Sequence, residues 1–251
     1  MALDIGSFSV TEGSYDDDFE INPGVTPGKA FLGLAGDDIM WSGGKSSVVI
    51  KGKTWLIPSI IAGGQGNDKY RFSNKTNTII ADSSSSDGDS IKIYEYISEI
   101  TGLYTVDKRH ILIYFADGGS IYLVDGLNSR GAIETIEFMD VSYNGSVSSI
   151  SSLINGFQAP DYTLEEVVDN GFLNPSVMGV SSAAGVRQII EDIYADALPR
   201  VSFSYGSLSV SEGEALSILG KTRNVKSGDR IYWKIAGASI TSGDLATGQT
   251  F

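Results

Sequence analysis

The chain has 251 residues, of which 41% are hydrophobic and 20% charged, a composition that indicates a folded globular protein. Its net charge of −13 argues against binding to nucleic acid or anionic membranes, because both need a basic surface. The absence of cysteine excludes disulfides and thiolate metal sites, and no apolar run is long enough to predict a membrane span. The N-terminus lacks the basic and apolar regions of a Sec signal peptide.

Residues 1–32 are expected to form an N-terminal segment of strands and loops. Residues 6–13 (GSFSVTEG) recur with two conservative changes as residues 206–213 (GSLSVSEG). An eight-residue repeat is too short to indicate duplicated domains. The acidic run Asp16-Asp17-Asp18 is interpreted as a solvated loop, with a contribution to cation binding as the alternative.

A glycine-rich motif occurs twice in the next part of the chain. Residues 63–71 (GGQGNDKYR) fit the nonapeptide G-G-x-G-x-D-x-U-x, in which U is a large apolar residue and is here Tyr70. Residues 33–41 (GLAGDDIMW) have the same frame, with Leu34 in place of the second glycine. The glycines permit tight turns with positive φ, and the aspartates supply carboxylates that suit a hard cation.

Each motif is followed by a degenerate nonapeptide, which has Ser47 or Asn77 at the Asp position. In the RTX repeats that these motifs resemble, two nonapeptides make one coil of roughly eighteen residues. Residues 33–50 and 63–80 are therefore predicted to be two stacked coils, and residues 51–62 an insertion between them. The side of the coils that carries Ser47 and Asn77 is expected to bind an ion weakly or not at all.

The two motifs resemble the calcium-binding β-roll repeats of RTX, or haemolysin-type, proteins. The resemblance implies calcium as the cofactor, and calcium takes about six to eight oxygen ligands. Because equivalent positions of the coils differ by 30 residues, Asp38 is expected to lie over Asp68, with a cation between carboxylates that would otherwise repel. The expected ligands in these turns are Asp37, Asp38, Asn67 and Asp68, with the backbone carbonyls of Gly36, Gly64 and Gly66.

An Asp-rich passage follows the second coil and contains Asp82, Asp87 and Asp89. RTX domains often close with a similar passage. The sequence leaves two interpretations open, since these carboxylates either ligate the last calcium ion or shape the turn between two strands.

A series of strands is predicted next, from the alternation of apolar and polar residues. Residues 116–119 (ADGG) are expected to be a hairpin turn. The passage resembles the segment that follows the repeats in haemolysin-type proteins, so this domain is expected to span residues 33–146. His110 is the single histidine and is interpreted as structural. The strands are expected at residues 90–96, 110–115, 120–125 and 132–139.

Residues 147–199 are predicted to be a helical connector. Thr163 and Glu166 form a capping box at the start of a short helix. A second helix is expected over residues 182–198, where Pro199 stops it. Its apolar face is expected to pack on a neighbouring domain rather than on a separate partner.

Residues 200–251 return to a period of two and are expected to begin a β-sandwich. They resemble the first half of a Calx-β or related Ig-like module, with Glu212, Trp233 and Asp244 at the corresponding places and Leu245 where the family has an aromatic residue. A sandwich of this kind needs roughly 100 residues, so we expect the chain to be the N-terminal part of a longer protein.

The sequence thus predicts a mainly-β protein, in which a short calcium β-roll runs into a β-meander, a helical connector and an incomplete β-sandwich. The expected function is non-enzymatic, because neither G-x-S-x-G nor H-E-x-x-H occurs. We expect a calcium-stabilised structural or adhesin-like region of a large secreted or cell-surface bacterial protein, exported by a type I-like route, with self-association or a surface matrix as its partners. The alternatives are the calcium-binding accessory region of a secreted hydrolase, and a viral or filament structural protein.

Overall fold

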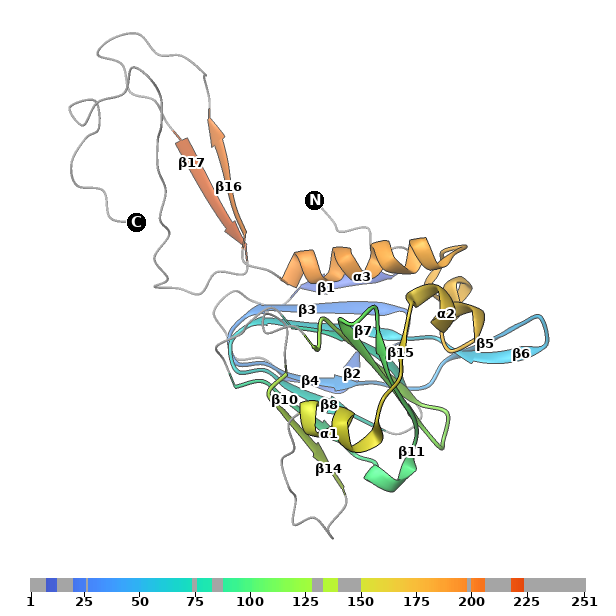
Figure 1. The fold of residues 1–251 in the computed structure, drawn as a ribbon. Coiled ribbons are helices and arrows are strands. Elements are labelled where there is room, and N and C mark those ends of the chain that lie inside the picture. The colour runs from blue at the N-terminus through green and yellow to red at the C-terminus, as the bar shows by residue number, and fades with distance from the viewer. Residues whose placement is uncertain are drawn as a thin grey trace, which may run out of the picture.

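The structure is a computed structural model, and its main body consists of two stacked sheets covered by helices (Figure 1). The predicted mainly-β class is confirmed. Among the described residues, no helix combines the length and the apolar character needed to cross a membrane. The described residues are 8–12, 20–25, 27–73, 76–82, 88–127, 133–139, 150–197, 200–205 and 218–223.

The larger sheet is buried on both faces. Its central strands are nearly continuous runs of branched and aromatic apolar residues, as expected for strands covered on both sides. Consecutive side chains such as Ile60 and Ile61 enter two different hydrophobic cores. In spatial order its strands are β1 (Ser9–Glu12), β3 (Lys29–Ala35), β7 (Ser59–Gln65), β9 (Asn77–Ala81), β13 (Ser120–Val124), β12 (His110–Phe115), β11 (Ile100–Val106) and β15 (Asp161–Tyr162).

The smaller sheet packs on one face of the larger sheet. Met40, Tyr70 and Ile91 are buried in the core between the sheets. On the opposite, partly exposed face, Lys92 and Glu137 form an ion pair of 2.8 Å. In spatial order its strands are β14 (Thr135–Phe138), β10 (Ser90–Ile93), β8 (Lys69–Phe72), β4 (Ile39–Ser42) and β2 (Glu20–Val25).

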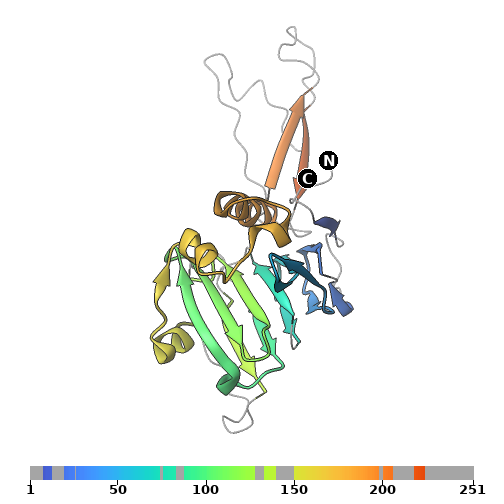
Figure 2. The ribbon, with the colours of Figure 1, turned by 90° about the vertical axis from the view of Figure 1, so that its right-hand side faces the viewer.

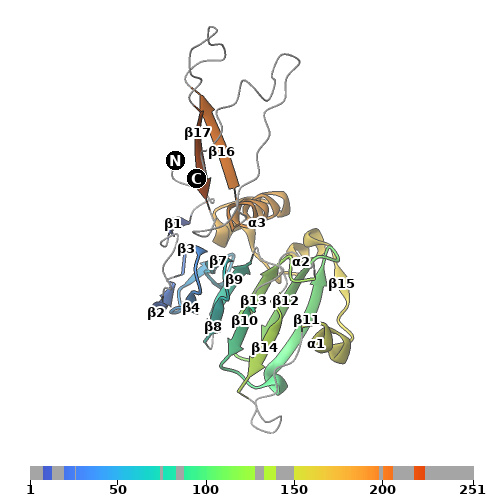
Figure 3. The same cartoon turned by 90° about the vertical axis from the view of Figure 1, so that its left-hand side faces the viewer.

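The two sheets are built from rungs, each of which is one strand of the larger sheet followed in the chain by one strand of the smaller sheet. The described residues contain five rungs in chain order, namely β1–β2, β3–β4, β7–β8, β9–β10 and β13–β14. Neighbouring rungs pair in parallel in both sheets. Figure 3 shows β7, β9 and β13 following one another in the larger sheet. We call this arrangement the rung stack.

Rungs 2 and 3 confirm the predicted offset of 30 residues. Leu34 pairs with Gly64 in the larger sheet, and Ile39 pairs with Lys69 in the smaller sheet. Asp38 and Asp68 immediately precede the latter pair, so they occupy equivalent positions in neighbouring rungs.

The predicted extent of the first coil, residues 33–50, is wrong. β5 (Ser47–Ile50) pairs with β6 (Lys53–Leu56) in a separate antiparallel hairpin. The reason lies in its two-residue turn. Lys51 and Gly52 both have positive φ, 51° and 78°, as a type I′ hairpin turn requires. The chain therefore folds back on itself after β4 and returns to the larger sheet only at β7.

The expected equivalence of Ser47 and Asn77 is wrong for the same reason. Ser47 pairs with Leu56 in the hairpin, whereas Asn77 begins β9 of the larger sheet. Their neighbours differ accordingly, because Val49 is 66% exposed and Ile79 only 2%. The two residues do not form an opposite side of the rung stack.

The domain boundary predicted at residue 32 falls inside β3, and β1 and β2 form a complete rung before it. The boundary predicted at residue 146 lies outside the described residues. Residues 8–25 carry no glycine-rich motif, and backbone pairing places them in the stack. The predicted meander is divided between the sheets, since β10 and β14 pair in parallel in the smaller sheet. β12 and β13 form the expected hairpin, and β11 is an additional strand beside it.

The predicted helical connector is a third layer of the main body. Val186, Ile189 and Ile193 pack into the same core as Leu32 and Ile60 of the larger sheet, and Figures 1 and 2 show α3 beside the sheets. The capping box of Thr163 and Glu166 is confirmed. The helices are α1 (Ile150–Phe157), α2 (Leu164–Asp169) and α3 (Ala183–Ala197), with short 3-10 turns η1 (Ile97–Glu99) and η3 (Pro175–Met178).

The described part of the C-terminal segment is one antiparallel pair, β16 (Arg200–Tyr205) and β17 (Ile218–Arg223). The residues on which the Calx-β resemblance depends, Glu212, Trp233, Asp244 and Leu245, lie outside the described residues, as does the acidic run at residues 16–18.

Candidate metal centre

A column of acidic residues follows one edge of the smaller sheet. In rungs 2, 3 and 4, the turn that arrives from the larger sheet ends on Asp38, Asp68 and Asp89, each immediately before the small-sheet strand. The strands pair in register, so these residues stack one above the other. Glu134 continues the column in rung 5, before β14. We call these four residues the acidic column.

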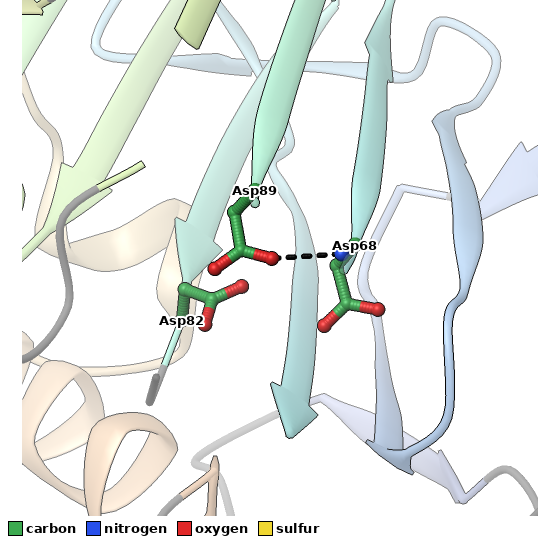
Figure 4. A group of neighbouring side chains, drawn as sticks. All are labelled: Asp68, Asp82 and Asp89. Atoms are coloured by element: carbon green, nitrogen blue, oxygen red, sulfur yellow. Dashed lines mark hydrogen bonds between the residues drawn. The ribbon is translucent and has the colours of Figure 1, made fainter. Parts of the chain in front are cut away.

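Asp68, Asp89 and Glu134 each accept a hydrogen bond from the backbone of the preceding rung. The N–H of Asp38 donates to Oδ1 of Asp68 over 2.8 Å, and the N–H of Asp68 donates to Oδ1 of Asp89 over 2.7 Å. Figure 4 shows the second of these bonds. The N–H of Asp89 donates to Oε2 of Glu134 over 2.8 Å. The carboxylates therefore satisfy backbone donors that a strand would otherwise leave unpaired at its start.

A second position in the turns decides how much room these carboxylates have. The pairing of Leu32 with Ala62, and of Ala62 with Ala81, makes the following residues of the three rungs equivalent. Rungs 2 and 3 have glycine there. A Cβ on Gly63 would lie 2.1 Å from Oδ2 of Asp68, so glycine is required for the carboxylate to fit. In rung 4 the equivalent residue is Asp82, which adds a carboxylate instead.

This substitution creates a cluster of three carboxylates between rungs 3 and 4. Asp68, Asp82 and Asp89 each offer an oxygen, and these atoms lie within 4.8 Å of one another. All three residues are buried, with exposed fractions of 0%, 1% and 0%. Figure 4 shows that they come from three separate strand ends and converge. We call them the aspartate triad.

Tyr70 reaches the triad from β8. Its hydroxyl lies 2.5 Å from Oδ2 of Asp82 and 3.1 Å from the carbonyl oxygen of Ala81, and it accepts a hydrogen bond of 2.9 Å from the N–H of Gly63. The ring is fully buried. Burial, together with the neighbouring Asp82 and the other carboxylates, raises the pKa of Tyr70 well above its usual value, so the hydroxyl keeps its proton and is the donor to Asp82.

The electrostatics of the triad favour a positive partner. Burial, and then the nearby charges of Asp38, Asp89 and Asp37, raise the pKa of Asp68 to about 8, although the hydrogen bond from the Asp38 N–H acts in the opposite direction. Oδ2 of Asp68 is buried and accepts no hydrogen bond from any described residue. Neutralising such a group requires a proton or a cation, and three carboxylates are the oxygen ligands that a hard divalent cation prefers.

The predicted ligands separate into two groups. Asp68, Asp82 and Asp89 meet in the triad. Asp38 lies beside Asp68 in the column, yet it is not a member of the triad. The cation site that the geometry favours is therefore one rung beyond the expected pair of Asp38 and Asp68. Asp87 lies outside the described residues.

Asp37 and Asn67 lie in a second, more exposed column. The N–H of Asn67 donates to Oδ1 of Asp37 over 2.8 Å, and Oδ1 of Asn67 accepts from the N–H of Gly88 over 2.8 Å. These side chains link the turns of successive rungs and are separate from the triad.

The three glycines predicted as carbonyl ligands have the expected positive φ, with 124° for Gly36, 104° for Gly64 and 140° for Gly66. Close stacking of the turns explains why they are glycines. A Cβ on Gly66 would lie 1.9 Å from the carbonyl oxygen of Gly36, and one on Gly64 would lie 2.2 Å from that of Leu34. Any larger residue would push neighbouring rungs apart.

Two residues of the site escaped the sequence analysis. The motif identifies Tyr70 only as its apolar U residue, although a phenol also has a hydroxyl that can reach the end of the turn. For Glu134 the sequence pattern predicts only a place in a strand. The signal that could have found it is an acid immediately before each strand of the smaller sheet, which Asp38, Asp68 and Asp89 share with it.

His110 is the first residue of β12 and is not a member of the aspartate triad. Its Nδ1 accepts a hydrogen bond of 2.9 Å from the N–H of Asp125, and its side chain is buried. Burial, followed by the positive charge of Arg109, lowers the pKa of His110 to about 4. The imidazole is therefore neutral at pH 7.

Comparison with known proteins adds no relative, since neither a protein-family model nor a curated protein matches the chain. The resemblance to RTX proteins stays a prediction from the glycine-rich motifs.

Proposed function

We propose that this chain is a non-enzymatic structural module whose rung stack is stabilised by calcium bound at the aspartate triad. The observation that carries the proposal is the burial of three carboxylates within 4.8 Å of one another. Asp68, Asp82 and Asp89 would hold the ion. Calcium would supply positive charge to this cluster of carboxylates, and its flexible coordination suits oxygens that come from separate turns.

The energetic argument links the ion to the stability of the stack. Buried carboxylates that face one another disfavour the folded state unless their charge is compensated. The unfolded chain disperses the same residues, because Asp68 and Asp89 come from different rungs. A ligand that binds the folded state alone stabilises it, by about 2.7 kcal/mol when its concentration is 100 times Kd. We therefore expect calcium to raise the stability of rungs 3 and 4 most strongly.

The biological setting that we propose is a secreted or cell-surface bacterial protein with an adhesin-like or matrix role. The glycine-rich motifs support it through their resemblance to RTX repeats. A site that works outside the cell can be weak, because extracellular calcium modules have Kd values of about 10⁻⁴ to 10⁻³ M. His110 supports a structural role, since its Nδ1 is already occupied by a backbone N–H.

Calcium titration of the purified chain tests the proposal. Isothermal titration calorimetry and thermal unfolding, each with calcium, with magnesium and with EDTA, should show saturable calcium binding and a rise in Tm. Asp82→Asn and Asp89→Asn keep the hydrogen-bonding shape and should weaken binding at least about tenfold. Asp37→Asn is the matched control, because Asp37 lies in the separate exposed column.

Two results would contradict the proposal. One is a wild-type chain whose Tm and heat of titration do not respond to calcium. The other is equal weakening by Asp37→Asn and Asp82→Asn, which would place the ion outside the triad or show only a general effect of acidic surface charge.

A further inference from the structure

Tyr70 connects the glycine-rich turn of rung 3 to the Asp of rung 4. Its hydroxyl accepts a hydrogen bond from the N–H of Gly63, which precedes it in the same motif. It lies within hydrogen-bonding distance of Oδ2 of Asp82 and of the Ala81 carbonyl oxygen. One hydroxyl therefore contacts both rungs between which the triad is formed.

The direction of its proton follows from these contacts. A phenol has one O–H, and the lone pair that faces Gly63 is already used as an acceptor. The proton must then point towards rung 4. Of the two oxygens there, Oδ2 of Asp82 is the closer at 2.5 Å, against 3.1 Å for the Ala81 carbonyl, and it carries charge. A charge-assisted hydrogen bond of this length is strong and fixes the orientation of the carboxylate.

The strand register shows why the hydrogen bond from Tyr70 to Asp82 matters for the cation site. Asp82 occupies the position that is Gly33 in rung 2 and Gly63 in rung 3. Its carboxylate is therefore the ligand that rung 4 adds and that the earlier turns do not have at this position. Groups that orient a metal ligand typically change metal affinity about 10- to 100-fold when they are removed.

We propose that Tyr70 is a positioning residue of the cation site, which orients the Asp82 carboxylate for ligation and places its aromatic ring beside the bound ion. This inference rests on the proposed function. It adds a residue that is not itself a ligand, and it predicts a spectroscopic property, since a tyrosine beside a bound lanthanide transfers excitation energy to it.

The test uses terbium as a luminescent substitute for calcium, because Tb³⁺ is also a hard cation that prefers oxygen. Tyr70→Phe removes the hydroxyl and keeps the ring volume. Tyr122→Phe is the matched control, because Tyr122 is equally buried and its hydroxyl has no hydrogen-bond partner among the described residues. The measurements are calcium Kd by calorimetry, tyrosine-excited Tb³⁺ emission, and unfolding in EDTA.

We expect Tyr70→Phe to weaken calcium about tenfold and to reduce Tb³⁺ emission at a given concentration, while Tyr122→Phe behaves as the wild type. In a double-mutant cycle, adding Tyr70→Phe to Asp82→Asn should weaken binding further by much less than tenfold, because the orienting contact is already altered. A merely structural role would lower stability in EDTA without this coupling.

The inference is overturned if Tyr70→Phe retains the wild-type calcium Kd, or if the two substitutions weaken binding independently. A wild-type Tb³⁺ excitation spectrum with no tyrosine component overturns it without any variant. These outcomes differ from failure of the proposed function, in which the wild-type chain binds neither calcium nor terbium.

Discussion

The backbone N–H of Asp38 donates a 2.8 Å hydrogen bond to Oδ1 of Asp68, which stands 30 residues later and one rung away. The same relationship links Asp68 to Asp89. One oxygen of each acceptor thus satisfies a backbone donor of the previous rung. In Asp68 the other oxygen, Oδ2, is left buried next to Gly63 and free to face a cation. Asp68 therefore has two roles, which are to accept a backbone hydrogen bond and to present a carboxylate oxygen to a cation. Substitution by asparagine can separate them.

Asp68→Asn should have opposite effects with and without calcium. The asparagine Oδ1 can still accept the Asp38 N–H, while the free-energy cost of protonating this buried carboxyl on folding, which its raised pKa implies at neutral pH, is removed. In EDTA at neutral pH we expect the free energy of unfolding to rise by about 1–3 kcal/mol. In saturating calcium the variant should be less stable than the wild type, because a ligand has been lost.

Urea unfolding of both proteins in EDTA and in calcium measures this reversal. Asp37→Asn again serves as the control and should show no reversal. Loss of stability in both buffers would mean that Asp68 acts mainly through the shape and hydrogen bonds of its turn.

The motif position of Leu34 imposes a backbone conformation that is unfavourable for leucine. Leu34 replaces the second glycine of the nonapeptide and has φ of +82°, close to the 104° of Gly64 with which it pairs. A positive φ costs a non-glycine residue about 1–2 kcal/mol. The side chain is nevertheless only 1% exposed and packs in the core under α3. Loss of a buried leucine costs about 2–5 kcal/mol, so packing outweighs the strain.

We therefore expect both truncations of Leu34 to destabilise the chain, but Leu34→Gly by about 1 kcal/mol less than Leu34→Ala, because glycine relieves the strained backbone. Leu112 of β12 is the comparison site, since it is fully buried and has no positive φ. There Leu112→Gly should be the worse of the two. Denaturant unfolding of the four variants measures these differences in stability. If the glycine variant is also the less stable of the two at Leu34, as expected at Leu112, the strain argument is contradicted.

The sequence predicted the register between rungs 2 and 3 because the turns themselves carry the information. Glycine at positions such as 36 and 66 is demanded by the close approach of a neighbouring carbonyl, and such demands repeat whenever rungs stack. The mainly-β class followed from alternating and continuous apolar runs. The capping box of Thr163 was visible because it is a local motif.

What escaped prediction depends on pairing between distant segments. The rung formed by β1 and β2 has no motif, and its strands are held by backbone pairing. The Lys51-Gly52 turn removes β5 from the stack, although its Val-Val-Ile run looks like a stacked strand. The role of Asp82 depends on a pairing of Ala62 with Ala81, an offset of 19 residues that a nonapeptide frame does not contain. The triad could be named from the sequence only as separate acidic residues.

His110 should make stability fall with acid. Its pKa is lowered from 6.5 to about 4, mainly by burial, and its Nδ1 can accept the Asp125 N–H only while the ring is neutral at that nitrogen. The unfolded chain therefore binds a proton more readily than the folded chain. The contribution to stability is complete above pH 6.5, declines as pH falls from about 6.5 towards 4, and amounts to roughly 3 kcal/mol. The charged groups that act on the pKa of His110 are Arg109, Asp125, Asp107 and Glu191.

His110→Asn isolates this contribution, because its side-chain oxygen can take the place of Nδ1 as an acceptor. Unfolding free energies measured in EDTA between pH 4.5 and 7, a range chosen to cross the histidine titration, should fall less steeply with acid for the variant than for the wild type. Equal slopes would show that carboxylates, rather than His110, control the acid response.

Gly63→Ala should damage both the fold and the cation site. The added Cβ would lie 2.1 Å from Oδ2 of Asp68 and 2.4 Å from the Tyr70 hydroxyl, so at least one of these side chains must move. Both are buried, and moving either disturbs the triad. Overpacking of this kind costs about 1–3 kcal/mol. We expect lower stability in EDTA and also a smaller gain from calcium, because the displaced groups are those that hold or orient the ligands.

Gly156→Ala is the control for the same chemical change. A Cβ there meets no atom within 4 Å, and the residue lies in α1, so alanine should be neutral or stabilise the helix by about 0.5–1 kcal/mol. Thermal unfolding of the two variants with calcium and with EDTA gives the comparison. If Gly63→Ala lowers Tm equally in both buffers, the crowding acts on the rung stack alone, and Asp68 and Tyr70 can shift without loss of the site. If instead the calcium-dependent rise in Tm shrinks only in Gly63→Ala, the room that this glycine leaves is part of the binding site.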